Sequence, residues 1–192
     1  YGQNLSILSG TVQYQAPMAG PALTLSGASI AGNVQFSAGQ PVNIQSFTFI
    51  SGTISGVDPI STSGLFTWNS GTMNVGGDFT ASGPVTINSL GNTRNLLRDF
   101  YNAATMTFLS GGISPSSADI TNLTSGTIDI RTTGSAFGLA TNSTLFNNGT
   151  LIKTAGNGVS TIGNHFRNTG TVEVQIGTLQ FTGTNGITSV QT

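Results

Sequence analysis

Short segments in which polar and apolar residues alternate recur along the chain. The clearest is Thr171–Ile176, and the same alternation occurs in Thr127–Ile130, Thr72–Val75 and Pro84–Ile87. A period of two places one face of a β-strand in a core and the other face in solvent. Thr and Val also favour strands, because branched side chains suit a pleated surface. The pattern therefore predicts an all-β chain of short strands.

A glycine motif recurs between these segments: Ser, Thr or Asn, then Gly, usually Thr, and then an aliphatic residue. Copies lie at Ser9–Val12, Ser51–Ile54, Ser70–Met73, Ser125–Ile128, Asn148–Leu151 and Thr169–Val172, with looser ones at Ser26–Ala28 and Ser110–Ile113. Their spacing follows a period of roughly 20 residues, which is typical of solenoid repeats. The longer interval between Gly71 and Gly111 corresponds to two periods. Glycine suits a corner that needs a positive φ or a close approach of the backbone.

Three all-β architectures compete for this pattern. A sandwich is not expected to repeat itself at a regular interval, and a transmembrane barrel would carry aromatic girdles that this chain lacks. A parallel β-helix explains the period directly, because each coil is one repeat whose inward side chains stack on those of its neighbours. The hexapeptide repeat of left-handed β-helices is absent. We therefore predict a right-handed parallel β-helix of roughly nine coils, forming a single domain over residues 1–192.

One segment departs from the alternation. Within residues 92–104 the apolar positions 96, 97, 100, 101 and 104 have helical spacing, and Arg94, Arg98 and Asp99 add three charges. This spacing predicts a short helix or loop insert near 92–104. It would either protrude as a contact element or lie on the wall of the solenoid with its charges solvated.

Composition excludes several functional classes. Charged residues are 6% of the chain against roughly 25% in a typical soluble domain, so its polarity comes from hydroxyls, amides and 27 glycines. Five scattered Lys and Arg residues and a net charge of −1 argue against nucleic acid as a partner. No apolar run approaches the ~20 residues of a membrane-spanning helix. The chain has no Cys, and its beginning does not read as a signal peptide, so we expect a segment or subunit of a longer exported assembly.

The C-terminal third carries a recognisable repeat. Phe146–Lys153 and Phe166–Leu179, which contain Asn-Asn-Gly-Thr-Leu and Asn-Thr-Gly-Thr-Val, resemble modules of filamentous-haemagglutinin-like and autotransporter-passenger-like bacterial adhesins. The resemblance is clear over residues 140–183 and weaker back to Leu8. It implies a secreted, extended β-helical protein with a role in adhesion, matrix or filament formation. It transfers no catalytic residues, because the repeat contains none.

Residues for catalysis are sparse. Glycan-cleaving β-helices need carboxylates that converge on one wall, and the six acids here are Asp58, Asp78, Asp99, Asp119, Asp129 and Glu173. Asp58 and Asp78 are separated by one repeat period, so a stacked pair is conceivable, although like charges repel and no base lies nearby in the sequence. Solvated turn carboxylates are the simpler interpretation, and a calcium role is disfavoured with the catalytic one. We predict no catalytic residue, no metal site and no cofactor.

Isolated candidates have plain structural interpretations. His165 is the single histidine, so a metal site of the usual histidine type cannot form within one chain, and we expect it at the edge of a coil. Trp68 and Tyr101 could stack on sugars, but Trp68 shares a face with apolar neighbours and is expected in the core. Ice binding by ranked threonines would draw on Thr105, Thr107 and Thr127, but the Thr-x-Thr pair does not recur on every coil.

Both ends of the sequence predict further strands, over Leu5–Val12 and Gly186–Val190, without an amphipathic cap. Exposed terminal coils offer unpaired edges that normally meet more β-structure. We therefore expect a non-catalytic extracellular or cell-surface protein, a scaffold, adhesin or filament subunit that self-associates head to tail. Cell-surface or matrix glycans are candidate partners. The alternative function is that of a carbohydrate-binding or carbohydrate-cleaving β-helix.

Overall fold

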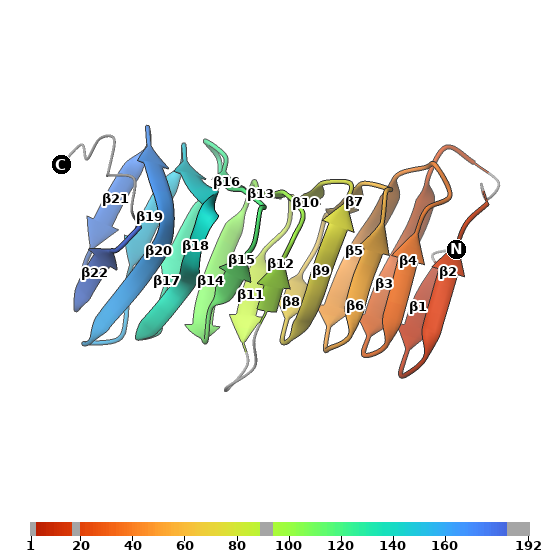
Figure 1. Ribbon diagram of the computed structural model, residues 1–192, viewed down its shortest axis with the longest axis horizontal. Helices are drawn as coiled ribbons and strands as arrows, with labels where there is room; N and C mark the ends of the chain where they lie inside the picture. Colours follow the sequence, from red (N-terminus) through yellow and green to blue (C-terminus); the bar gives the residue numbers. More distant parts are fainter. Residues whose placement is uncertain (1–2, 17–19, 89–93, 184–192) are drawn as a thin grey trace.

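The computed structural model is a parallel β-solenoid of about eight turns, close to the nine predicted. It describes residues 3–16, 20–88 and 94–183, which form 22 strands in one continuous sheet with every pairing parallel. Strands β1 (Gln3–Ile7) and β2 (Thr11–Tyr14) lie at one end of the stack, and β21 (Thr171–Val174) and β22 (Thr178–Phe181) at the other (Figure 1). The described residues form no helix, and hence none that could cross a membrane. The predicted stack of coils is confirmed, whereas its right hand stays a prediction.

Three walls of stacked strands enclose the core. Wall 1 contains the first halves of β3 (Leu23–Ile30) and β5 (Val42–Phe49), β7 (Ile60–Thr62), β10 (Phe79–Ala81), β13 (Phe100–Asn102), β16 (Ile120–Asn122), and the ends of β18 (Gly134–Asn147) and β20 (Val159–Asn168). Wall 2 contains β1, the second halves of β3 and β5, β8 (Phe66–Trp68), β11 (Val85–Asn88), β14 (Thr105–Ser110), β17 (Thr127–Ile130), β19 (Thr150–Lys153) and β21. Wall 3 contains β2, β4 (Asn33–Phe36), β6 (Thr53–Gly56), β9 (Gly71–Gly76), β12 (Arg94–Leu96), β15 (Ile113–Pro115), the starts of β18 and β20, and β22.

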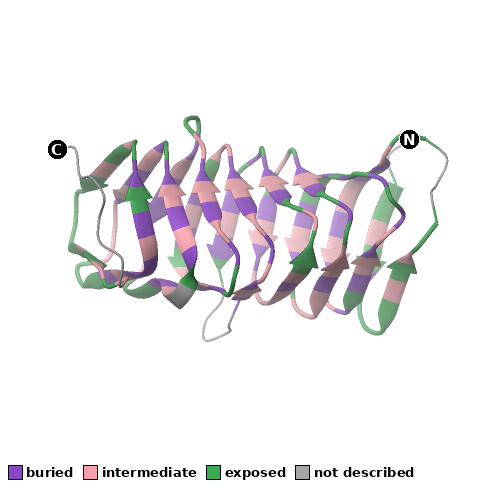
Figure 2. Ribbon diagram, turned by 45° about the horizontal axis from the view of Figure 1, so that its top comes forward, coloured by how far each residue is buried: buried purple, intermediate pink, exposed green. Residues whose placement is uncertain are grey.

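The core is a set of columns that run along the solenoid axis. On wall 1 one inward column contains Leu23, Val42, Ile60, Phe79, Phe100, Ile120, Leu145 and Phe166, all of them buried. Rings stack within the columns, with centroids 5.1 Å apart for Phe79 and Phe100 and 4.9 Å apart for Phe47 and Phe66. Burial alternates along most strands, which confirms the predicted period of two, and the strands at both ends of the stack are less buried (Figure 2).

The recurrent glycines lie at corners, as predicted, but not always at the same corner. Gly52 and Gly71, each with positive φ, lead into wall 3, whereas Gly126 and Gly149 lead into wall 2. At Gly52 a side chain would collide with the carbonyl oxygen of Gly32, so the backbones there need glycine. Coils also differ in length: the one that ends at Asn147, opposite Asn122, is longer than the early coils of the stack. The spacing between copies of the glycine motif therefore depends both on the length of each coil and on which corner of the coil the glycine occupies.

The predicted helical insert near 92–104 is wrong for the described residues of that segment; positions 92 and 93 lie outside them. Residues 94–96 form β12 and residues 100–102 form β13, and each strand pairs on both sides. Leu96 and Phe100 point into the core from two consecutive strands separated by one corner, which mimics helical spacing. A helical turn would satisfy its backbone only partly, whereas the two strands join ladders that are already in place. Arg94 and Arg98 are buried rather than solvated.

Four asparagines on successive coils form a buried, hydrogen-bonded column on the inner side of wall 1. We call this column the asparagine ladder; it consists of Asn102, Asn122, Asn147 and Asn168. Each Nδ2 of the first three donates to Oδ1 of the next, over 2.8, 2.7 and 2.7 Å in chain order. The amides also donate to backbone carbonyls: Asn122 Nδ2 donates to Gly126 O in the corner that follows it, at 3.2 Å, and to Thr150 O in the next coil, at 3.0 Å. The ladder thus satisfies carbonyl groups where the chain leaves wall 1.

The asparagine ladder should contribute to stability out of proportion to its size. Replacing Asn122→Leu keeps the approximate volume but removes the donor to Asn147 and Thr150 and the acceptor for Asn102. We expect a loss of about 2–3 kcal/mol, or a fall in Tm of roughly 5–10 °C, in thermal unfolding followed by circular dichroism. The exposed neighbour Asn148→Ala is the control and should change stability by less than about 0.5 kcal/mol. Equal effects of the two substitutions would contradict this role.

Candidate functional site

Buried or half-buried polar side chains line the corner between wall 3 and wall 1, where they bond backbone groups of the neighbouring coil. Asp58, 2% exposed, accepts the backbone N–H groups of Ala38 and Gly39 at 2.7 and 2.9 Å. Asp99 accepts the N–H of Asp119 at 2.8 Å, and Asp119 accepts that of Thr144 at 2.7 Å. Because a buried backbone N–H must find a partner, these carboxylates replace the ladder where coil length changes. They are structural acceptors rather than simply solvated turn residues.

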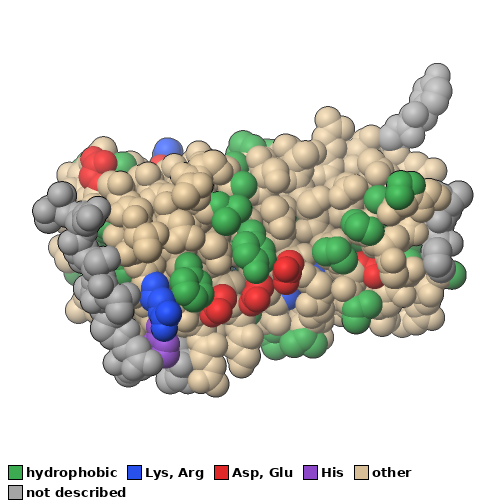
Figure 3. All heavy atoms as spheres, turned by 90° about the horizontal axis from the view of Figure 1, so that it is seen from above, with side chains coloured by type: hydrophobic (Ala, Val, Ile, Leu, Met, Phe, Trp, Pro, Cys, Tyr) green, Lys and Arg blue, Asp and Glu red, His purple; other side chains and the backbone are tan. Residues whose placement is uncertain are grey.

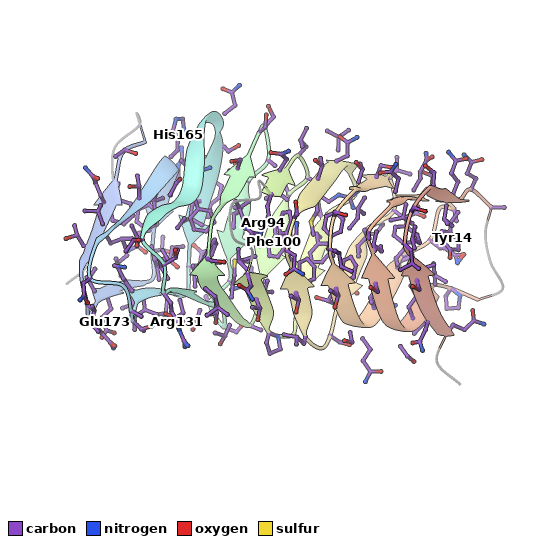
Figure 4. All side chains as sticks on the ribbon, turned by 90° about the horizontal axis from the view of Figure 1, so that it is seen from below. Tyr14, Arg94, Phe100, Arg131, His165 and Glu173 are labelled. Carbon is purple, nitrogen blue, oxygen red and sulfur yellow. The ribbon has the colours of Figure 1, made fainter. Side chains whose placement is uncertain are left out.

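Carboxylates do align on adjacent coils, but not in the pair considered from sequence. Asp58 and Asp78 are one residue out of register, because Asp78 stands opposite Pro59. Asp78, Asp99 and Asp119 instead occupy one column, each directly before an inward residue of wall 1. The same column continues through Thr144 and His165. His165 is half-buried at the edge of a coil, as expected, and lies along the opposite edge from Arg131 and Glu173 (Figure 4).

Three cations are buried and act as donors to main-chain carbonyls. Arg94 Nε donates to Trp68 O at 2.9 Å, and its Nη1 donates to Gly112 O at 3.0 Å. Lys153 Nζ donates to Ala155 O and to the hydroxyl of Ser160, at 2.8 and 2.9 Å. Burial lowers the pKa of both cations. The third buried cation, Arg98, also donates to main-chain carbonyls and also has a pKa lowered by burial.

Arg98 lies under the column of aspartates. Its Nε donates to Asn74 O at 2.9 Å and its Nη2 to Gly56 O at 3.2 Å. Burial lowers its pKa to about 10, and the negative charge of Asp78 opposes the shift. Asp129 is also buried and is held by Arg131 and Thr154, both at 2.6 Å. Most of the charge in this chain is therefore committed to the fold.

Arg131, which follows β17, and Glu173, in β21, are exposed away from wall 1. The other exposed charges, Asp78 and Arg167, lie with the half-buried Asp99, Asp119 and His165 on the outer side of wall 1. Its outer column contains Thr24, Asn43, Ser61, Thr80, Tyr101, Thr121, Phe146 and Arg167, and the column of Asp78, Asp99, Asp119, Thr144 and His165 runs beside it. We call these two columns the wall-1 face. Figure 3 shows the acidic side chains in a row on this face, with hydrophobic, basic and histidine side chains beside them. Among the described surfaces, the wall-1 face is the one that carries both hydrogen-bonding and aromatic side chains.

Among the described residues, two aromatic side chains point outward, and both are on the wall-1 face. Tyr101 and Phe146 are half-buried members of the outer column, separated by Thr121. The guanidinium of Arg167 lies 5.8 Å from the centroid of the Phe146 ring. Trp68, in contrast, is fully buried and donates from Nε1 to Ser70 O at 3.0 Å, which confirms its predicted core role. Of the two aromatics considered for sugar stacking, only Tyr101 is accessible.

A shallow depression of about 330 Å³ lies at the N-terminal part of wall 1 and its corner with wall 2. Six of its eight lining residues carry hydroxyl or amide groups, namely Thr24, Ser26, Asn43, Gln45, Ser61 and Ser63, and the aliphatic Leu25 and Ile44 complete the lining. Within it the hydroxyl of Ser61 donates to Asn43 Oδ1 at 2.8 Å. The depression includes the first three members of the outer column, and Thr80 separates it from Tyr101 on that column.

Ranked threonines occur on wall 2 but do not form a double array. One outer column contains Thr48, Thr67, Thr86 and Thr107, and another contains Thr105, Thr127, Thr150 and Thr171. The two columns share a coil only at β14. Beyond that coil the first column continues with Asp129 and Ile152. The Thr-x-Thr pair noted in the sequence therefore stands alone, and the array that ice binding would need is not formed.

The two ends of the stack present open strand edges within the described residues. β1 pairs only with β3 and β2 only with β4, while β21 pairs only with β19 and β22 only with β20. The core residues next to these edges are only partly buried: Leu5, Val12 and Tyr14 at one end, and Val172, Leu179 and Phe181 at the other. The strand predicted over residues 186–190 lies outside the described part of the chain.

No known protein family, curated protein or solved structure was found to match the chain. Within the described residues, no group of three or more His, Asp or Glu side chains is arranged to hold a metal ion. The fold thus defines a class, a parallel β-solenoid repeat protein, compatible with the predicted β-helix. The wall-1 face and the two open ends are the features from which a function can be argued.

Sequence reasoning missed the asparagine ladder and the outer column. The ladder had a signal, because Asn147 and Asn168 stand at the same place in successive repeats, directly before Asn148-Gly149 and Thr169-Gly170. Phe146 had none. It is two coils away from Tyr101 in the chain, and only the register of the intervening coils places both on one column.

The column of Asp78, Asp99 and Asp119 should raise the pKa of Tyr101. Burial raises the pKa of Tyr101, and Asp78, Asp99 and Asp119 raise it further because they oppose formation of the negative phenolate. Replacing Asp78→Asn should therefore lower the pKa of Tyr101, measured from the ultraviolet absorbance of tyrosinate with the Tyr101→Phe variant subtracted. High salt should reduce the difference by screening. The control Glu173→Gln, on wall 2, should leave the pKa unchanged; equal shifts would disprove the coupling.

Proposed function

We propose that this protein is a non-catalytic structural solenoid that assembles end to end, as a scaffold, adhesin stalk or filament subunit outside a bacterial cell. The observation that carries the proposal is the pair of open ends. Each end exposes a parallel strand edge on walls 2 and 3, above apolar core residues that are only half-buried. Such edges pair readily with further β-structure.

The two ends are compatible with one another. β1 and β21 belong to wall 2, and β2 and β22 belong to wall 3, so the last coil of one copy offers strands in the same two walls as the first coil of the next. A contact between different surfaces of identical copies does not close on itself unless the rotation happens to form a ring, and it otherwise generates a filament. A second copy is therefore the occupant that we propose for each end.

The interior supports a mechanical rather than a chemical role. Asp58, Asp99, Asp119 and Asp129 accept hydrogen bonds from the fold itself. A general acid or base must instead reach a substrate with a suitably perturbed pKa. Export to the cell surface is proposed from the adhesin-like repeats over residues 140–183 and from the absence of Cys.

End-to-end assembly predicts concentration-dependent polymers in sedimentation velocity and filaments in negative-stain electron microscopy. Val12→Lys in β2 and Val172→Lys in β21 would each bury an ammonium at the junction, which we expect to weaken association by about 3 kcal/mol, or roughly a hundredfold in Kd. Ser46→Lys, on an exposed outer position of wall 2, is the matched control and should still polymerise.

The opposite result is easily recognised. A folded wild-type chain that stays a monodisperse monomer across the concentration range would overturn end-to-end assembly. Release of new sugar ends from neutral or acidic polysaccharides would overturn the non-catalytic role, and would support the alternative of a carbohydrate-cleaving β-helix.

A further inference from the structure

We propose that the wall-1 face is a binding site for a linear, uncharged, β-linked polysaccharide that runs along the solenoid axis. The proposal does not depend on end-to-end assembly, because it concerns the side of the solenoid and not its ends. It rests on the placement of the two outward-pointing aromatic rings, on the groups around them and on the depression in line with them.

The aromatic placement is selective. Away from the two ends, every described aromatic side chain except Tyr101 and Phe146 is buried in the core. These two lie on one outer column with Thr121 between them, two strand spacings or roughly 9.5 Å apart. That separation is close to the repeat of a disaccharide in an extended β-linked chain. Aromatic rings present the apolar surface against which the C–H faces of sugar rings pack, while Tyr101 adds a hydroxyl.

The polar groups around the rings match sugar hydroxyls. Asp99 and Asp119 run beside Tyr101 and Thr121, and each carboxylate is fixed by one backbone N–H at 2.8 or 2.7 Å. An ionised carboxylate offers about four acceptor positions, so each retains capacity for the hydroxyl groups of a ligand. Arg167, exposed beyond Phe146, supplies donors at the C-terminal end of the column. These two carboxylates are held before a ligand arrives, which lowers the entropic cost of binding.

The depression extends the same track. Beyond Tyr101 the outer column continues through Thr80 to Ser61, Asn43 and Thr24, the last three of which line the 330 Å³ depression. A chain laid along the column would thus meet hydroxyl and amide groups after the aromatic pair. Both parts belong to one wall, so a single extended ligand can contact them together.

Charge selects the class of polysaccharide. Asp78, Asp99 and Asp119 place three carboxylates in one column, against one exposed guanidinium on the same face. A polyuronate would bring its own carboxylates against this row, and like charges close together are unfavourable. An uncharged glycan avoids that repulsion and still donates its hydroxyls. The uncharged polysaccharide is therefore the occupant we assign.

The test is isothermal titration calorimetry of the full chain with a soluble β-1,4-linked gluco-oligosaccharide longer than four sugars, compared with a β-1,4-linked oligoglucuronate of similar length, which differs in charge but not in linkage. We expect binding of the neutral ligand, and at least tenfold weaker binding of the acidic one. Tyr101→Ala and Phe146→Ala should each weaken neutral binding roughly tenfold, because each removes one ring platform. Tyr101→Phe keeps the ring and should retain most of the affinity.

Controls separate loss of contact from loss of fold. Leu109→Ala removes an exposed apolar side chain from wall 2 and should leave binding unchanged. Each variant is compared with wild type by circular dichroism and thermal unfolding, and Tyr101→Phe replaces Tyr101→Ala if the latter unfolds, with the loss then read from Phe146→Ala. No binding by the wild type, preference for the β-linked oligoglucuronate, or an equal loss in Leu109→Ala would each overturn the proposal.

Discussion

The parallel backbone ladder, and the need to complete it at every corner, is the constraint on which this structure depends. Along the three walls each strand between the two end coils pairs with the coils on either side, so its N–H and C=O groups are satisfied without any particular side chain. At the corners the coils differ in length, and the ladder alone cannot reach every group. Buried amides, carboxylates and guanidinium groups complete it, as Asn122, Asp58 and Arg94 do at the three kinds of corner.

This use of polar side chains explains why so few charges remain for chemistry. A buried charge is costly unless it is well bonded, and each buried one here contacts main-chain or side-chain partners. The surface is left to Ser, Thr, Asn and Gln, which hydrate well without strong electrostatic fields. Wall 1 differs from this uniform surface because it carries carboxylate, aromatic and guanidinium groups close together. These groups belong to the column of Asp78, Asp99 and Asp119 and to Tyr101, Phe146 and Arg167.

End-to-end assembly and glycan binding, the two proposed activities, use different surfaces of the solenoid. Stacking lengthens the molecule along its axis through β1, β2, β21 and β22, whereas glycan binding uses the side of wall 1. Neither surface covers the other. A polymer of such units would repeat the wall-1 face at regular intervals, and linked copies bind a long ligand with a higher effective concentration than single copies. Weak individual contacts would then suffice for adhesion to a polysaccharide.

The sequence by itself determined the local structure: strands, from alternation such as Thr171–Ile176; corners, from Gly-Thr motifs; and a stacked all-β class, from their recurrence. It misassigned residues 92–104, because two short strands around one corner imitate helical spacing, and the burial of Arg94 and Arg98 gave no local signal. Only the tertiary structure decided which residues share a column. Alternation is a property of neighbours in the chain, whereas register between coils depends on corner length and on contacts a full coil away in the sequence. For that reason the asparagine ladder, the aspartate column and the pairing of Tyr101 with Phe146 emerged only from the folded chain.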